Sequence, residues 1–117
     1  IEREKREKEH RRYLEEQQRK RKIAERIELE KQKTQELVNE AKDYQIACEI
    51  RNYIGAIKNN VHLSKSQEEW IKWAECKADW YDPTIAAEDK YFGKRNHRDS
   101  QNEKELFNKQ TFTKYNW

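Results

Sequence analysis

The first 33 residues constrain the fold most strongly, because they contain no glycine or proline and two thirds of them are charged. They carry 13 basic and 9 acidic side chains and very little apolar surface to bury. Such a segment builds no core, but it can form a solvated helix, because each acidic residue four positions before a basic one adds about 0.2–0.5 kcal/mol. The pairs with this spacing are Glu2–Arg6, Glu4–Lys8, Glu7–Arg11, Glu15–Arg19 and Glu16–Lys20.

The remaining residues have a different composition. Residues 34–117 hold 13 basic and 14 acidic side chains, all four tryptophans, all three phenylalanines and five of the six tyrosines. Because aromatic side chains supply most of the buried surface, we expect the core after about residue 35. We predict an all-α fold, a long charged, coiled-coil-like helix leading into a small helical bundle. Residues 1–35 form the projecting charged helix, and residues 36–117 form the bundle, of three or more helices, with an aromatic C-terminal tail.

Apolar side chains follow a heptad spacing along the first helix, although Glu30 and Thr34 interrupt it, so a coiled coil is allowed but weakly specified. This stripe consists of Ile23, Ile27, Leu37, Ala41, Tyr44 and Cys48. Later steps of three and four predict a packed face, made of Leu37, Ala41, Tyr44, Ala47, Ile50, Ile54, Ile57 and Val61. Gly55 is expected to admit a close neighbour. A helix that ends at Asn59 and Asn60 would be about 90 Å long.

A second helix is predicted to begin at a capping box, for which there are two candidates, Ser64 with Gln67 and Ser66 with Glu69. Its main apolar stripe is Trp70, Ala74, Ala78 and Tyr81, with Trp73 and Trp80 beside it. A broad aromatic face needs partners on two sides. We therefore assign Trp70, Trp73, Trp80 and Tyr81 to a core or an interface.

A third helix is predicted to follow the only proline. Asp82 is suited to the N-cap position and Pro83 to the first helical position, and Gly93 is a suitable end. Residues 94–104 are predicted to be a solvated loop. The tail places Leu106, Phe107, Phe112, Tyr115 and Trp117 in a polar background. It is either a strap across the bundle or a peptide that binds a partner.

Arg51 lies close to the apolar face of the first helix, where an unpaired charge is costly. Asp79 and Asp82 are the carboxylates expected within reach on the second helix, so we predict a structural ion pair of these three residues. The alternative is acid–base or metal chemistry at Asp79, Asp82, Glu88 and Asp89. We disfavour it, because acidic residues are common at helix starts and no histidine stands at a ligand spacing.

Other catalytic and metal sites are also disfavoured. Cys48, His62, Cys76 and His97 lack the short paired spacings of structural zinc sites. Gly55 and Gly93 are the only glycines, so there is no oxyanion-hole segment for a Cys–His nucleophile and no phosphate loop. We expect no enzyme, no cofactor, no metal and no small-molecule substrate. Two cysteines suggest reduced, half-buried thiols in a cytoplasmic protein, and no apolar run approaches the ~20 residues of a membrane span.

The most basic patch consists of Arg19, Lys20, Arg21, Lys22 and Arg26. It precedes the heptad stripe, which is the arrangement of a basic zipper. Glu15, Glu16 and Glu25 dilute its positive charge, so a solvated helix face is the favoured interpretation. Direct nucleic-acid binding through this patch is the alternative.

The segments "IRNYIGAI" and "EEWIKWAECKADWYDP" resemble the C-terminal region of uncharacterised bacterial proteins with a helix-turn-helix-like N-terminal segment. The resemblance covers less than half of the chain. It runs through Ile50, Arg51, Tyr53, Ile54, Ala56, Ile57, Trp70, Trp73, Ala74, Ala78, Asp79, Asp82 and Pro83. It implies a DNA-associated or regulatory protein and brings no catalytic residues. Because the chain begins at Ile1, we expect that an N-terminal reader of DNA is missing here.

Together these features predict a non-enzymatic interaction or scaffolding module, in which the long helix is a spacer or a dimerisation element. The expected partner is a protein or a second copy of the chain, with nucleic acid as the alternative.

Overall fold

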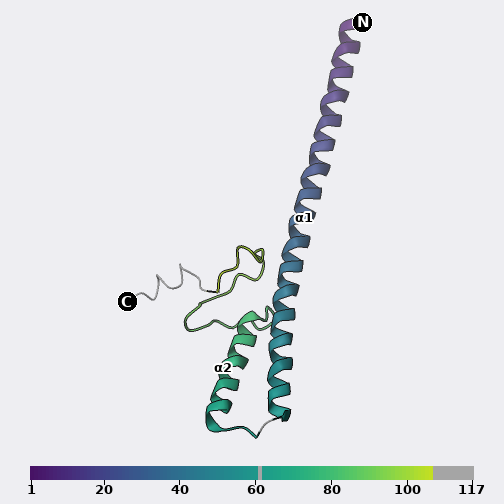
Figure 1. The fold of residues 1–117 in the computed structure, drawn as a ribbon. Helices are drawn as coiled ribbons and strands as arrows, with labels where there is room; N and C mark the ends of the chain where they lie inside the picture. Colours follow the sequence, from purple (N-terminus) through teal and green to yellow (C-terminus); the bar gives the residue numbers. More distant parts are fainter. Residues whose placement is uncertain (61, 107–117) are drawn as a thin grey trace, which may run out of the picture. The chain divides into compact units, whose positions relative to one another are not determined.

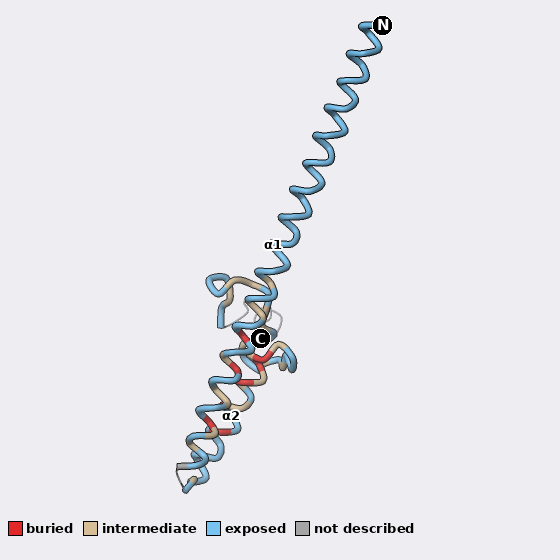
Figure 2. The backbone as a smooth tube through the Cα atoms, turned by 90° about the vertical axis from the view of Figure 1, so that its right-hand side faces the viewer, coloured by how far each residue is buried: buried red, intermediate tan, exposed pale blue. Residues whose placement is uncertain are grey.

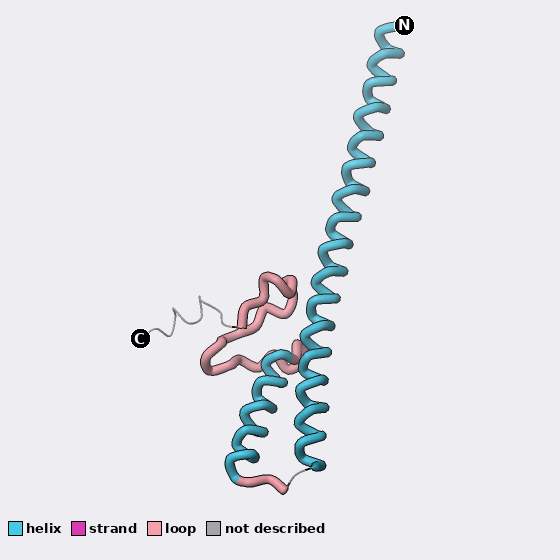
Figure 3. The backbone as a smooth tube through the Cα atoms, viewed as in Figure 1, coloured by secondary structure: helices cyan, strands magenta, loops and turns pink. Residues whose placement is uncertain are grey.

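The computed structural model describes residues 1–60 and 62–106, and its regular structure there consists of two helices (Figures 1 and 3). Helix α1 spans Glu2–Asn60 and helix α2 spans Lys65–Tyr81. Within the described residues there is no strand, only an isolated antiparallel bridge between Asp89 and Gly93. The predicted all-α fold is therefore confirmed. No helix in the described part is long and apolar enough to cross a membrane.

The chain divides into two compact units, Ile1–Thr34 and Gln35–Trp117. The division falls one residue before the boundary expected from the sequence. Every residue of the first unit is exposed (Figure 2).

Oppositely charged side chains four residues apart form ion pairs along the surface of the first unit. Glu2 with Arg6 and Glu16 with Lys20 form two of the predicted pairs, at 3.9 and 3.7 Å. Exposed pairs of this kind stabilise a helix by only a few tenths of a kcal/mol each. The helical state of this unit therefore rests on many weak local terms rather than on burial.

The core of the second unit lies between the last part of α1 and α2, which run side by side (Figures 1 and 2). Ile54, Ile71 and Ala74 are its buried centre, and Ile50, Ile57 and Leu63 pack against them. Ala47 and Ala78 are completely buried. Small side chains at these two positions allow the helices to approach closely.

The prediction of a packed face on α1 is wrong for its first half, which is exposed to solvent. Leu37 and Tyr44 are 64% and 46% exposed, Ala41 is exposed as well, and the buried side chain in this stretch is Asp43. The buried apolar face begins only at Ala47. Val61 of the predicted face lies outside the described residues. The close neighbour expected at Gly55 is also absent from the described part, because a Cβ there would meet nothing within 4 Å.

Helix α2 begins at the first of the two predicted capping boxes. The backbone N–H of Gln67 donates to Ser64 Oγ at 3.3 Å, and the Ser64 N–H donates to Gln67 Oε1 at 2.8 Å. The helix ends at Tyr81, and the N–H of the C-cap residue Asp82 donates to the Ala78 carbonyl at 3.0 Å.

The predicted third helix is wrong, and with it the bundle of three or more helices, because the described residues contain only α1 and α2. One turn does start after Pro83, since the N–H groups of Ile85 and Ala86 donate to the Asp82 carbonyl at 3.1 and 2.7 Å. It stops at Ala86, whose φ of 51° lies in the left-handed region.

Contacts with α2 explain why the chain reverses here. The indole N–H of Trp80 donates to the Gly93 carbonyl at 2.8 Å, and Lys77 Nζ lies 2.5 Å from Asp89 Oδ2. Asp89 and Gly93 exchange backbone hydrogen bonds of 3.0 and 2.9 Å, a closure that uses the φ of 74° at Gly93. A helix through Gly93 would carry these groups away from α2 by about 1.5 Å per residue.

Candidate functional site

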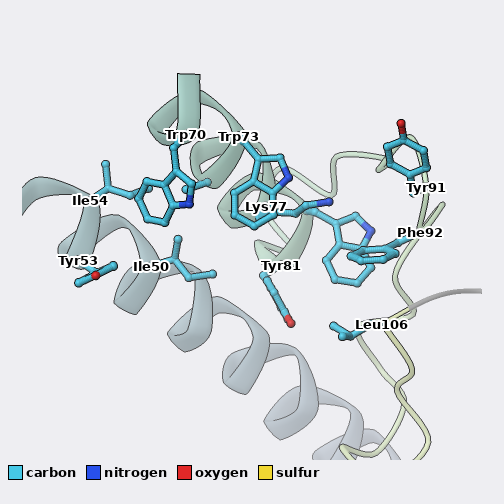
Figure 4. A pocket seen from close by; sticks show the side chains of 12 residues that line it. Ile50, Tyr53, Ile54, Trp70, Trp73, Lys77, Tyr81, Tyr91, Phe92 and Leu106 are labelled. Atoms are coloured by element: carbon cyan, nitrogen blue, oxygen red, sulfur yellow. The ribbon is translucent and has the colours of Figure 1, made fainter. Parts of the chain in front are cut away.

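An open-sided aromatic groove of about 590 Å³ lies between α1, α2 and the segment that follows α2 (Figure 4). Its lining is almost entirely apolar, and its volume is within the ~300–1,000 Å³ of ligand pockets. Helix α1 contributes Ile50 and Tyr53, α2 contributes Trp70 and Trp73, and the following segment contributes Tyr91 and Leu106.

Large apolar side chains on the rim of the aromatic groove are open to solvent. Tyr53, Trp73 and Tyr91 are 62%, 55% and 67% exposed. The ring of Tyr53 meets that of Trp70 edge-on at 6.4 Å between centroids, and Trp70 lies 6.2 Å from Trp73. Clustered exposed aromatic surface of this kind is typical of an interaction site.

The aromatic groove contains one charged side chain, Lys77, and that charge is neutralised. The Lys77 ammonium bonds to Asp89 and lies 4.3 Å from the ring centroid of Phe92. Burial alone raises the pKa of Asp89, but hydrogen bonds from Lys77 and from the N–H groups of Tyr91 and Phe92 bring that pKa below its ordinary value of 3.8. The Asp89 carboxylate therefore stays ionised near neutral pH, and its contact with the Lys77 ammonium leaves the groove without net charge.

The four aromatic residues assigned to a core or an interface have different surroundings. Trp80 is 1% exposed and packs against Tyr81 and Phe92 at 5.0 and 5.3 Å, so it belongs to the core. Tyr81 is half-buried, whereas Trp70 and Trp73 are exposed on the groove. Ala74 and Ala78 of the predicted main stripe are buried, as expected. The assignment of Trp70 to that stripe is wrong, because it is exposed, and the flanking Trp80 is buried instead, together with Ile71.

The structure brings Arg51, Asp79 and Asp82 together. Arg51 Nη1 donates to Asp82 Oδ2 at 2.7 Å, and Nη2 donates to Asp79 Oδ1 at 3.0 Å. Asp82 is nearly fully buried and also accepts from the N–H and hydroxyl of Thr84 at 2.9 and 2.7 Å. Burial raises the pKa of Asp82, but the bonds from Thr84 and Arg51 outweigh it and lower that pKa. With these bonds in place, the three side chains tie the end of α2 to α1.

A second buried carboxylate, Asp43, was not singled out from the sequence. It has no exposed surface, and three basic side chains surround it. Arg95 donates through Nε and Nη2 at 2.8 and 3.1 Å, Lys104 Nζ lies 3.1 Å away, and His97 Nδ1 lies at 2.8 Å. We call these four residues the Asp43 cluster. It joins the segment after α2 to the middle of α1.

Residues 94–104 form a loop, as predicted, but the Asp43 cluster shows that it is not solvated throughout, because the side chains of Arg95, His97 and Lys104 are largely buried. Burial raises the pKa of Asp43, but the hydrogen bonds from Arg95, His97 and Lys104 lower it further than burial raises it. The ionised carboxylate only accepts, so His97 Nδ1 carries the proton of their shared bond. The Arg95 guanidinium also lies 4.7 Å from the Tyr81 ring.

One signal for the Asp43 cluster was present in the sequence. Steps of three and four back from Ile54 and Ile50 reach Ala47 and then either Tyr44 or Asp43. Apolarity favours Tyr44, but an aspartate on the apolar face is the position that demands a basic partner. Several basic residues stand between residues 94 and 104.

The basic patch of residues 19–22 and 26 lies on the first unit, and its five side chains are all exposed. Lys20 pairs with Glu16 at 3.7 Å, and no carboxylate of the described residues forms an ion pair with the other four. The acidic Glu15 and Glu25 are exposed as well.

The heptad stripe of α1 also faces solvent. Ile23, Ile27, Leu37 and Tyr44 are 46–64% exposed, and Ala41 and Cys48 are exposed too. All six apolar positions of the stripe are thus accessible. The prediction that the two thiols are half-buried is wrong, because Cys48 and Cys76 are both exposed; neither forms a disulfide.

The described residues show no group of three histidine, cysteine, aspartate or glutamate side chains placed to hold a metal ion. Asp79, Asp82 and Asp89, which were candidates for acid–base chemistry, each accept from Arg51 or Lys77, while Glu88 is exposed. Comparison with protein-family models finds no match, and neither curated proteins nor solved structures match the chain.

Proposed function

We propose that this chain is a non-enzymatic interaction module of a bacterial, DNA-associated or regulatory protein, and that α1 pairs with α1 of a second copy. The exposed heptad stripe carries the proposal. Six apolar side chains lie on one helix and are accessible to a partner, at steps of three and four except for the gap between Ile27 and Leu37. Two such stripes bury one another when two helices wind together, and burial contributes about 25 cal/mol per Å² of apolar surface.

The interruptions of the stripe set the expected strength of this pairing. Glu30 and Thr34 occupy seam positions between Ile27 and Leu37 and are exposed, so the seam has no apolar contact there. Polar residues at seam positions lower stability while they favour one register. We therefore propose a reversible dimer. The bacterial and DNA-associated setting follows the sequence resemblance, and two unbonded thiols support a cytoplasmic location.

Sedimentation equilibrium of the whole chain tests the pairing. We expect a dimer whose dissociation constant rises at least tenfold when Ile23 and Ile27 are both replaced by lysine. Leu29→Lys is the matched control, because Leu29 is 56% exposed but lies about 200° around the helix from Ile27. A chain that is monomeric at all concentrations refutes dimerisation and leaves α1 the role of a spacer.

Nucleic-acid binding through residues 19–26 is the second candidate, favoured by the exposure of five basic side chains close together on one helix. It predicts an affinity that falls steeply with salt, with a slope of about −0.9 for each phosphate contacted in duplex DNA. Replacing Arg19, Arg21 and Lys22 by glutamine should reduce both the affinity and this slope. An affinity for duplex DNA that is unchanged in the triple variant refutes this second function.

A further inference from the structure

The aromatic groove has no part in the proposed dimer, whose stripe uses other residues of α1. Its walls nevertheless expose several aromatic rings that water solvates poorly, and the Lys77–Asp89 pair leaves it without net charge. An occupant should therefore be apolar and aromatic rather than charged. Figure 4 shows these rings around an open space, with Leu106 beside it.

We infer that the aromatic groove binds the chain's own C-terminal segment, residues 107–117, within the same molecule. This segment lies outside the described residues, and its sequence is FNKQTFTKYNW. It contains four aromatic residues, Phe107, Phe112, Tyr115 and Trp117, and no acidic residue. Its two lysines, Lys109 and Lys114, have long apolar stems, so their charged ends can stay in water on the open side of the groove. Rings of this kind pair edge-on or offset with the rings of Trp70 and Trp73.

The point where the segment begins supports this occupant. Leu106 lines the aromatic groove and directly precedes Phe107, so the segment starts at the groove wall. Eleven residues reach at most about 36–40 Å when extended. Helix α2, which forms one wall, has 17 residues and is about 26 Å long. The segment is long enough to follow the whole groove and needs no large loop to do so.

Tethering also favours this occupant over a separate molecule. A short flexible connection gives an effective concentration in the millimolar range. A separate ligand at micromolar concentration must therefore bind about a thousandfold more tightly to displace the segment. A second copy or another protein remains an outcome of the test.

A labelled synthetic peptide of residues 107–117 tests the inference by fluorescence anisotropy. In the full chain, Phe112, Tyr115 and Trp117 are replaced by serine, which leaves the described helices untouched. The peptide should bind this tail variant at least tenfold more tightly than it binds the unaltered chain, at low and at high salt. Adding Trp73→Ala should abolish binding, whereas Leu29→Ala, at a 56% exposed position outside both the groove and the heptad stripe, should not.

Three results overturn the inference: equal binding to both chains, binding to neither, or binding that does not depend on Trp73. If the unaltered chain binds the peptide better as it is diluted, the groove is occupied by a second copy instead. Limited proteolysis gives an independent measurement. Trypsin should cut after Lys109 and Lys114 several-fold faster in the Trp73→Ala chain than in the unaltered one, and equal rates contradict docking.

Discussion

Replacing Asp43 by asparagine should release the segment of residues 94–104 from α1. The carboxylate has no exposed surface, and its partners Arg95 and Lys104 are 6% and 1% exposed in their side chains. Asparagine has a similar shape but no charge. It leaves two buried cations without their counterion, which is the costly way to break a buried ion pair.

The magnitude follows from the contacts. Asp43 takes part in four short interactions with Arg95, His97 and Lys104, between 2.8 and 3.1 Å. Hydrogen bonds to charged groups contribute about 1.5–3 kcal/mol each, but the desolvation of three charges offsets most of that sum. Removing one partner of a buried pair typically costs about 3–5 kcal/mol. For a domain of this size, 3 kcal/mol lowers the melting temperature by at least about 12 °C.

Two measurements check this expectation. Urea denaturation followed by circular dichroism gives the change in unfolding free energy, and hydrogen exchange shows whether residues 94–104 lose protection. Glu40→Gln is the matched control, because Arg98 of the Glu40–Arg98 pair, one turn earlier on α1, is 69% exposed, so the pair should contribute less than about 1 kcal/mol. If Asp43→Asn costs no more than this control, the buried cluster does not hold the segment, and the reasoning fails.

Three further predictions concern pH, the Arg51 contacts and the helical glycine. The pKa of Asp43 and that of Asp82 lie below the ordinary 3.8 in the folded chain, so the unfolded chain binds more protons than the folded chain as the pH falls. The stability that these two carboxylates contribute is therefore complete above about pH 5 and is lost below 3.8. Urea denaturation midpoints at about pH 6 and about pH 3 will show this loss. Asp82→Ala should lower the free energy of unfolding by at least about 2 kcal/mol, because it leaves the Thr84 N–H and Arg51 Nη1 without their acceptor. Asp79→Ala, at a 44% exposed side chain, should lower it by less than about 1 kcal/mol. Equal shifts in melting temperature for the two variants would contradict the greater weight given to Asp82. Gly55→Ala should raise the unfolding free energy by about 0.5–1 kcal/mol, because the added methyl meets nothing within 4 Å, and a loss of stability refutes this.

The features predicted correctly depend on residues close together in the chain. The first half of helix α1 follows from the absence of glycine and proline in residues 1–33 and from charge pairs four residues apart, and the start of α2 follows from one capping box. The meeting of Arg51 with Asp79 and Asp82 was also foreseeable. The two carboxylates are three residues apart and flank the end of a helix that must pack against the face beside Arg51.

The candidate site was foreseen only in part. Tryptophans on α2 indicated an aromatic surface, but their exposure depends on which way α2 rotates against α1. Because Ile71, Ala74 and Ala78 turn inward, Trp70 and Trp73 face the groove, and Trp80 becomes core. Amphipathic periodicity does not separate these choices when more than one face of a helix is apolar.

The sequence by itself determined the long helix, the solvated first unit and the capping of α2, because helix propensity and neighbouring charges are local quantities. Only the tertiary structure decided the path after Tyr81. There, Trp80 and Lys77 hold Gly93 and Asp89, and Asp43 holds Arg95 and His97 from 52 and 54 residues away. Such contacts outweigh the local preference for a third helix, because a buried carboxylate and a buried indole N–H must find partners wherever the chain can supply them.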